Sequence, residues 1–123
     1  MNACSVKQRV LIVDDEPHIV AYLETLLQDN GYETMSASNG RTGLAIAARD
    51  KPDLIILDLM MPLQTGTELY KNLLCDGELG RIPVIVVSAV PDRHLAVRTP
   101  FAVFDKPIDP DVLLSAVRGA LGT

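Results

Sequence analysis

Short apolar runs alternate along this chain with longer segments in which apolar residues recur every three or four positions. The short runs are rich in β-branched residues, which favour strands, and the longer segments have the period of an amphipathic helix. This alternation is typical of an α/β fold built around a parallel sheet. The predicted strands are residues 9–14, 33–37, 53–58, 83–88 and 101–105.

The predicted strands differ in how completely they are apolar. The first, third and fourth contain the continuous apolar runs Val10–Val13, Leu54–Leu57 and Val84–Val87, as expected for strands covered by helices on both faces. The second, from Glu33 to Ala37, alternates between polar and less polar residues. We therefore expect it at the edge of the sheet, with one wetter face.

Helix signals fall between the strands and after the last one. Pro17 suits the first turn of a helix, and Gly31 can end that helix. Asp109 and Pro110 are typical of the N-cap and first residue of the final helix. Two further helices are predicted over residues 40–50 and 65–75. The residues expected to face inward are Ile19, Leu23, Leu26, Leu27, Leu44, Ala47, Ala48, Leu69, Leu73, Leu113, Val117 and Leu121.

The segment between the fourth and fifth strands carries the weakest helix signal. Residues 91–100 begin and end with proline, and their larger apolar side chains are Leu95 and Val97. There is room for about two helical turns at most. We expect a short helix or a loop there.

Size and composition limit the possible functions. The chain has 123 residues, which is enough for one domain, with its core expected over about 8–121. With 48% apolar residues, it is expected to be globular. A net charge of −5 without a Lys/Arg cluster argues against direct nucleic-acid binding. No apolar stretch is long enough to span a membrane and no signal-peptide pattern is present, so we expect a cytoplasmic location.

The two cysteines and two histidines show no metal-binding spacing. Cys4 and Cys75 are far apart in sequence, and we expect free thiols in a reducing compartment. Cys75, on a predicted helix, is interpreted as a small packing residue. His18 and His94 are isolated from other ligand types and are interpreted as solvated or packing residues.

Polar residues close each of four predicted strands. Asp14 closes the first and Asp15 follows it, Asp58 closes the third, Ser88 closes the fourth, and Lys106 follows the fifth. In open α/β sheets, ligands bind beyond the carboxyl ends of the strands, near the point where the strand order reverses. These side chains are therefore expected to form one site.

Three of these residues are carboxylates, which together favour a bound cation. If the strand order is 2-1-3-4-5, the first and third strands are neighbours, and Asp14, Asp15 and Asp58 converge. Clustered carboxylates that keep room for water and phosphate oxygens suit Mg²⁺. Glu16 is interpreted as an acidic residue at a helix start, favoured there by the helix dipole, rather than as a metal ligand.

With these motifs in their observed order, the chain resembles the receiver domain of two-component response regulators. The resemblance runs from Val10 to Leu121 and implies a flavodoxin-like (CheY-like), doubly wound, five-stranded parallel sheet of order 2-1-3-4-5. The motifs that carry it are Asp14-Asp15, Asp58 followed by Met61-Pro62, Gly66, Ser88-Ala89 and Lys106-Pro107.

The resemblance implies a phosphorylation switch. Asp58 would accept a phosphoryl group from a phosphohistidine on a sensor histidine kinase or a histidine phosphotransfer protein. Lys106 would pair with the phosphoryl oxygens, aimed by a cis peptide before Pro107, and Ser88 would donate its hydroxyl to them. The protein would then be a signalling phosphoacceptor, not an enzyme with a separate substrate, and would act on a downstream effector domain or protein.

The resemblance also implies the metal ligands. Asp15 would bind Mg²⁺ directly and Asp14 through water, and Asp58 and the backbone carbonyl of Met60 would be further metal ligands. The metal would offset charge on the phosphoryl group and fix in-line geometry.

Two features depart from the family pattern. Val103 stands where receivers commonly carry an aromatic switch residue, and period-2 alternation places the neighbouring Phe104 on the opposite face of the strand. Lys106 follows Ser88 by 18 positions (106 − 88), short of the family's usual spacing by about one helical turn. We therefore expect an altered output face.

Three other functions fit parts of the pattern. A receiver that is never phosphorylated would act only as a docking surface. A small Mg²⁺-dependent aspartyl-phosphate phosphatase would place its nucleophile after the first strand in an Asp-x-Asp pattern, whereas Asp14 and Asp15 are adjacent. A flavodoxin-like cofactor binder would need a Ser/Thr/Gly-rich phosphate loop after the first strand, where this chain has acidic residues.

Overall fold

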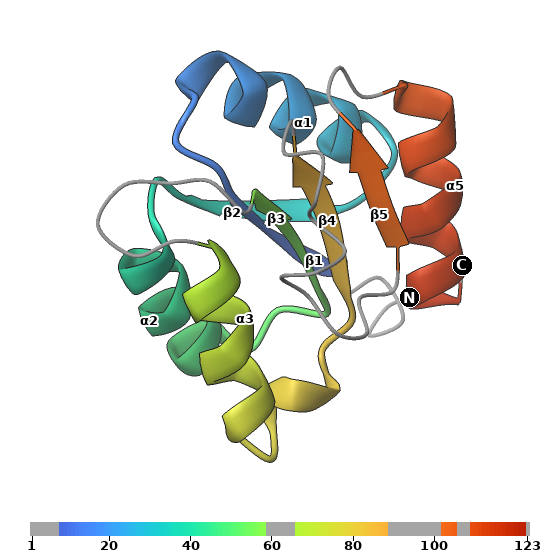
Figure 1. Ribbon diagram of the computed structural model, residues 1–123. Coiled ribbons are helices and arrows are strands. Elements are labelled where there is room, and N and C mark those ends of the chain that lie inside the picture. Colours follow the sequence, from blue (N-terminus) through green and yellow to red (C-terminus); the bar gives the residue numbers. More distant parts are fainter. Residues whose placement is uncertain (1–7, 59–65, 89–101, 106–108, 123) are drawn as a thin grey trace.

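A five-stranded parallel sheet of order β2-β1-β3-β4-β5 forms the centre of the molecule (Figure 1). The computed structural model describes residues 8–58, 66–88, 102–105 and 109–122. This strand order is the predicted one, and each observed strand end lies within one residue of its prediction. The elements are β1 (Arg9–Val13), α1 (Pro17–Asp29), β2 (Glu33–Ala37), α2 (Gly40–Asp50), β3 (Leu54–Asp58), α3 (Gly66–Cys75), the 3-10 helix η2 (Leu79–Arg81), β4 (Val84–Ser88), β5 (Ala102–Asp105) and α5 (Pro110–Leu121).

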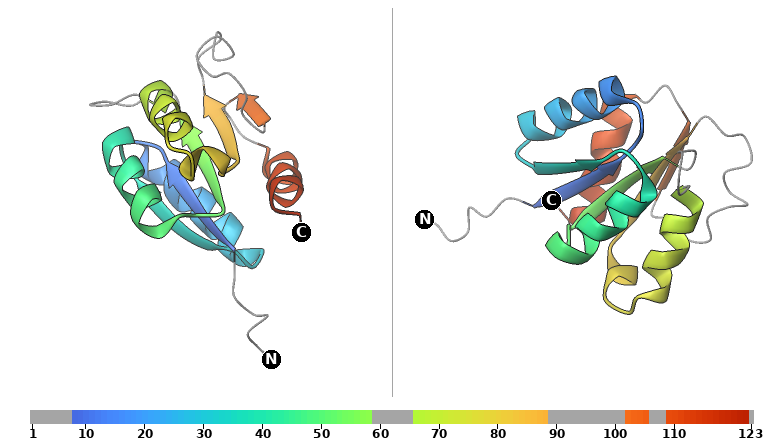
Figure 2. Two further views of the ribbon diagram at one scale, coloured as in Figure 1. Left: turned by 90° about the horizontal axis from the view of Figure 1, so that it is seen from below. Right: turned by 90° about the vertical axis from the view of Figure 1, so that its left-hand side faces the viewer.

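Helices cover both faces of the sheet (Figure 2). α1 and α5 pack on one face, and α2 and α3 pack on the other. Because successive side chains of a strand point to opposite faces, each central strand contributes to both layers. In β1, Val10 and Ile12 belong to the core beneath α1 and α5, whereas Leu11 and Val13 belong to the core beneath α2 and α3.

Burial follows the predicted strand types. All of β3 is buried, as are the last four residues of β1 and the first four of β4. β2 lies at the sheet edge, with Glu33 and Ser36 exposed and Ala37 buried. The alternating pattern of this strand therefore identified an edge.

Residues at the helix ends explain where the helices begin and end. Pro17 is the first residue of α1, and Gly31 follows its end with a φ of 92°, a left-handed conformation that glycine adopts without strain. Asp109 is the N-cap of α5, and its carboxylate accepts hydrogen bonds from the N–H groups of Asp111 and Val112. These boundaries agree with the predictions.

Two predicted packing positions were wrong. Ala48 is exposed, and the buried face of α2 consists of Gly40, Gly43 and Ala47. Adjacent helix residues are about 100° apart around the axis, so the neighbour of a buried residue easily faces water. Cys75 is also exposed, because it lies two positions beyond the buried Leu73 and so faces nearly the opposite side of the helix.

Several predictions concern residues outside the described ranges. These are the short helix or loop over 91–100, the positions of Phe101 and His94, and the thiol of Cys4. Among the residues that the structure does describe, no helix is both long and apolar enough to cross a membrane.

Candidate functional site

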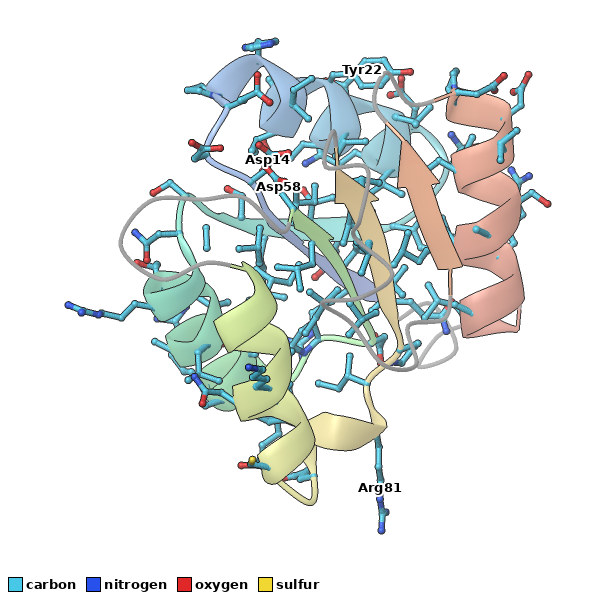
Figure 3. All side chains as sticks on the ribbon, in the orientation of Figure 1. Asp14, Tyr22, Asp58 and Arg81 are labelled. Carbon is cyan, nitrogen blue, oxygen red and sulfur yellow. The ribbon has the colours of Figure 1, made fainter. Side chains whose placement is uncertain are left out.

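The pairing of β1 with β3 places Asp14 beside Asp58. Val13 pairs with Leu57 in this parallel register, so the next residue on each strand lies at the same carboxyl edge of the sheet. Asp14 is 2% exposed and Asp58 is 4% exposed, and they are the two buried charged side chains in the described part of the chain (Figure 3). Two carboxylates that are far apart in sequence therefore lie close together, and both are almost fully shielded from solvent.

Hydrogen bonds fix the backbone at Asp14. Its N–H donates to the carbonyl of Ala37 at 3.1 Å, which continues the β1–β2 pairing by one residue. One carboxylate oxygen, Oδ1, accepts a hydrogen bond from the N–H of Glu16 at 2.9 Å. An aspartate that bonds the backbone two residues further on makes a local turn, and this turn leads the chain into α1.

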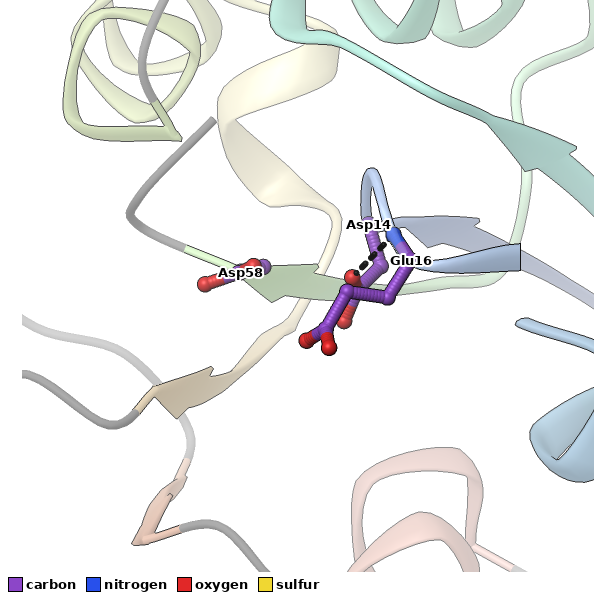
Figure 4. A group of neighbouring side chains, drawn as sticks. All are labelled: Asp14, Glu16 and Asp58. Atoms are coloured by element: carbon purple, nitrogen blue, oxygen red, sulfur yellow. Dashed lines mark hydrogen bonds between the residues drawn. The ribbon is translucent and has the colours of Figure 1, made fainter. Parts of the chain in front are cut away.

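That turn brings a third carboxylate to the site (Figure 4). Asp14, Glu16 and Asp58 each offer a carboxylate oxygen, and these three oxygens lie within 4.8 Å of one another. Glu16 is also the N-cap of α1, where its carbonyl accepts hydrogen bonds from Ile19 and Val20. Its side chain does not cap the helix.

Glu16 thus has more than the helix-start role that the sequence indicated. It does begin α1, as expected, but its half-buried carboxylate also joins the acidic cluster. Asp15 is exposed and is not one of the three clustered carboxylates. The signal that indicates Glu16 is local: an aspartate two residues before it turns the chain back toward the strand end.

The other expected site residues are only partly described. The backbone of Ser88 ends β4, next to Val87, which pairs with Asp58 in the sheet. The structure does not describe the side chain of Ser88, and Met60 and Lys106 lie outside the described residues. Their roles therefore remain predictions.

The described acidic cluster has the chemistry of a divalent cation site. Carboxylate oxygens are hard ligands, and Mg²⁺ prefers a few of them together with water and phosphate oxygens. Three oxygens within 4.8 Å of one another can share one ion. The donor set therefore fits Mg²⁺.

His18 is largely exposed to solvent, as its isolation in the sequence predicted, and its Nε2 lies 3.7 Å from Oε2 of Glu16.

Comparison with known proteins places this fold and site in one family. The model of the response regulator receiver domain matches residues 10–118. The protein Rrf1 of Nitratidesulfovibrio vulgaris is 33% identical, over 94% of this chain and 83% of that protein. PilH of Pseudomonas aeruginosa is also 33% identical, over 92% of this chain and 97% of that protein.

Longer regulators and solved structures agree with this assignment. The response regulator PleD of Caulobacter vibrioides is 40% identical over 89% of this chain, which corresponds to 25% of PleD. The structure of the chemotaxis protein CheY4 of Vibrio cholerae matches with a TM-score of 0.84 and 31% identity, over 94% of this chain and all of that one. The chain belongs to the response regulator receiver domains, the signalling domains of two-component systems.

Proposed function

We propose that this protein is a phosphorylation switch in which Asp58 accepts a phosphoryl group from the phosphohistidine of a sensor histidine kinase or a histidine phosphotransfer protein. The observation that carries the proposal is the position of Asp58, buried at the end of β3 with a carboxylate oxygen within 4.8 Å of those of Asp14 and Glu16. A carboxylate held in this way beside a cation site is a suitable nucleophile for phosphoryl transfer.

The proposed metal is Mg²⁺, held by Asp58 and Asp14 together with Glu16 or the exposed Asp15. The backbone carbonyl of Met60 completes the proposed ligands. When bound, the ion would offset the negative charge that otherwise keeps the phosphoryl group away from three carboxylates. The receiver domain of the Pseudomonas aeruginosa sensor kinase PA1611, which shares the fold at 23% identity, holds a magnesium ion in its active-site cleft.

In the proposed transfer, a carboxylate oxygen of Asp58 attacks phosphorus and forms an acyl phosphate. The phosphorus–nitrogen bond of the donor breaks, and the histidine nitrogen keeps the electron pair. Lys106 is proposed to pair with the phosphoryl oxygens, and Ser88 to donate its hydroxyl to them. The modified site would then change the surface that a downstream effector recognises.

Phosphorylation by acetyl phosphate tests this function. We expect intact mass measurement, in the presence of Mg²⁺, to show one added phosphoryl group that hydroxylamine removes, and we expect Asp58→Asn to abolish it. Asp29→Asn, which changes an exposed carboxylate at the end of α1, is the matched control and should be phosphorylated normally. A wild-type protein that acquires no adduct would contradict the proposal and favour a docking-only receiver. Turnover of an added phosphomonoester would favour the phosphatase.

Two further variants identify the metal ligands. If Glu16 is a metal ligand, as its position in the cluster suggests, Glu16→Gln should weaken Mg²⁺ binding more than Asp15→Asn does. The reverse order would support the ligand set implied by the family resemblance. Either variant should affect Mg²⁺ affinity more than Asp29→Asn.

A further inference from the structure

A cavity of about 390 Å³ lies beside the acidic cluster, between the start of α1 and the end of β2. In Figure 1, the first turn of α1 and the connection from β2 to α2 lie on the same side of the molecule. The volume is within the range of small-molecule sites. The lining residues are Asp14, Asp15, Pro17, Val20, Ala21, Glu24, Ser36, Ala37, Ser38 and Thr42.

The charge of this lining has one sign. Asp14, Asp15 and Glu24 contribute carboxylates, and no lysine or arginine is among the lining residues that the structure describes. Arg41 is next to Thr42 in sequence but is not part of the lining. α1 itself contains no lysine or arginine along its whole length. On this described lining, an anionic ligand would therefore meet carboxylates and no basic side chain.

Two of these carboxylates have no partner within the described part of the chain. Asp15 and Glu24 make no hydrogen bond or ion pair there, and Glu24 is half-buried. A partly desolvated carboxylate is stabilised by a cation. The N-terminus of α1 carries a partial positive charge of roughly half an elementary charge, which repels a cation. The negative charge of the carboxylates is larger, so a cation is still attracted.

The rest of the lining is apolar or carries hydroxyl groups. Val20, Ala21 and Ala37 offer contacts for an alkyl chain, and the hydroxyls of Ser36, Ser38 and Thr42 are acceptors for N–H groups. A hydrated metal ion would make no use of the apolar part. An ammonium or guanidinium group on a short alkyl chain would use all three kinds of lining.

We propose that this cavity binds an alkyl ammonium or alkyl guanidinium cation next to the phosphorylation site. Such a cation has two possible sources, a free amine and a lysine or arginine side chain of a protein that docks at this edge. The cavity shares Asp14 with the acidic cluster, so an occupant would lie beside the proposed phosphoacceptor. Only the partner-borne source rests on the proposed function.

Agmatine, which carries both cationic groups on a short alkyl chain, is the probe. We expect NMR titration of the full chain in saturating Mg²⁺ to show saturable binding, with a Kd on the order of 1 mM or tighter. The largest shifts should fall on amides of Val20, Ser36 and Thr42. Glu24→Gln should weaken binding by at least about fivefold, whereas Asp29→Asn should leave it unchanged.

A second variant tests whether the cavity is the binding site, and a neutral ligand tests whether binding requires a positive charge. Ala21→Lys, at an exposed lining position, should occupy the cavity with a tethered ammonium and block agmatine. Butylurea, which has a similar shape without charge, should not bind. The absence of saturable agmatine binding, equal binding of butylurea, or shifts confined to the cluster of Asp14, Glu16 and Asp58 would each overturn the proposal.

Phosphotransfer distinguishes the two sources. If the natural cation is a side chain of the phosphodonor protein, agmatine and Glu24→Gln should both slow transfer from a phosphorylated histidine phosphotransfer protein but not from acetyl phosphate. If the natural cation is a free amine, agmatine should bind without changing either rate. Asp58→Asn separates the cavity from the proposed function, because it should abolish phosphorylation and leave agmatine affinity unchanged.

Discussion

Gly43 of α2 packs directly against Val13 of β1, the residue before Asp14. A Cβ atom at position 43 would lie 3.0 Å from Cγ2 and 3.2 Å from Cγ1 of Val13, and 3.3 Å from Cδ2 of Leu69. These distances are shorter than ordinary van der Waals contact. The absence of a side chain therefore lets α2 approach the strand that leads into the acidic cluster.

Gly43→Ala should destabilise the protein. Alanine in a helix interior gains about 1 kcal/mol over glycine, but overpacking a core costs about 1–3 kcal/mol. We expect a net loss of about 1 kcal/mol in the free energy of unfolding, measured by urea denaturation. Ala45→Gly, at an exposed position of the same helix, measures the difference in helix propensity between alanine and glycine without the packing effect. A gain of about 1 kcal/mol for Gly43→Ala would show that Val13 moves aside without cost.

Removing the N-cap of α5 should weaken the protein by a similar amount. The Asp109 carboxylate accepts hydrogen bonds from Asp111 N–H at 2.9 Å and Val112 N–H at 3.3 Å. Asp109→Ala is expected to cost about 1 kcal/mol in urea unfolding, whereas Asp109→Ser should recover most of it. If Asp109→Ser were as unstable as Asp109→Ala, loss of the cap would not be the cause.

Lys51→Gly should stabilise the protein despite the loss of an ion pair. Lys51 follows α2 with a φ of 47°, a left-handed conformation that costs a side-chain-bearing residue about 1 kcal/mol relative to glycine. Its Nζ lies 2.9 Å from Glu78 Oε1, but both side chains are more than half exposed, and such pairs contribute about 0.5 kcal/mol or less. We expect a net gain of about 0.5 kcal/mol in thermal or urea unfolding.

Glu78→Gln provides the control for this substitution, because it removes the ion pair and leaves the backbone unchanged. A destabilisation by Lys51→Gly that matched the effect of Glu78→Gln would mean that the left-handed backbone carries no cost at this position.

Stability at low pH should depend on Asp76. Its carboxylate accepts hydrogen bonds from the N–H groups of Leu79 and Glu78 at 2.9 Å, and these bonds lower its pKa below the ordinary 3.8. Because the pKa is lower in the folded state, this stabilisation is fully present above about pH 4 to 5 and is lost as pH falls through the folded pKa. The urea midpoint of Asp76→Ala should therefore lie below that of the wild type near neutral pH. The two midpoints should converge toward pH 2 to 3, and a constant difference would argue against this linkage.

The resemblance to receiver domains implied the strand order, and with that order the meeting of Asp14 with Asp58 follows from regular features of the sequence. Apolar runs mark the buried strands, and the parallel register carries the residue after each strand to the same edge. The place of Glu16 follows from something less regular, a turn in which Asp14 bonds the backbone two residues ahead. The periodicity of apolar residues contains no information about such a turn.

The errors at Ala48 and Cys75 have a different origin. Helix periodicity identifies a buried stripe, but a small side chain at its margin has little apolar area with which to compete for burial. In α2, the close approach to Val13 requires glycine on the buried face. Because glycine is not counted as an apolar residue, the apolar pattern did not identify this face.

Magnesium should stabilise the folded protein, and this effect should depend on the buried cluster. An ion that binds only the folded state at a concentration of about 100 times its Kd adds about 2.7 kcal/mol to the free energy of unfolding. We therefore expect Mg²⁺ to raise the Tm of the wild type. Asp58→Asn should lose most of this rise, because it removes a carboxylate that is only 4% exposed and lies within reach of Asp14 and Glu16. In EDTA the same substitution should raise the Tm, since it relieves repulsion among clustered negative charges. Asp29→Asn should change neither value, and an equal Mg²⁺ response in all three proteins would place the ion elsewhere.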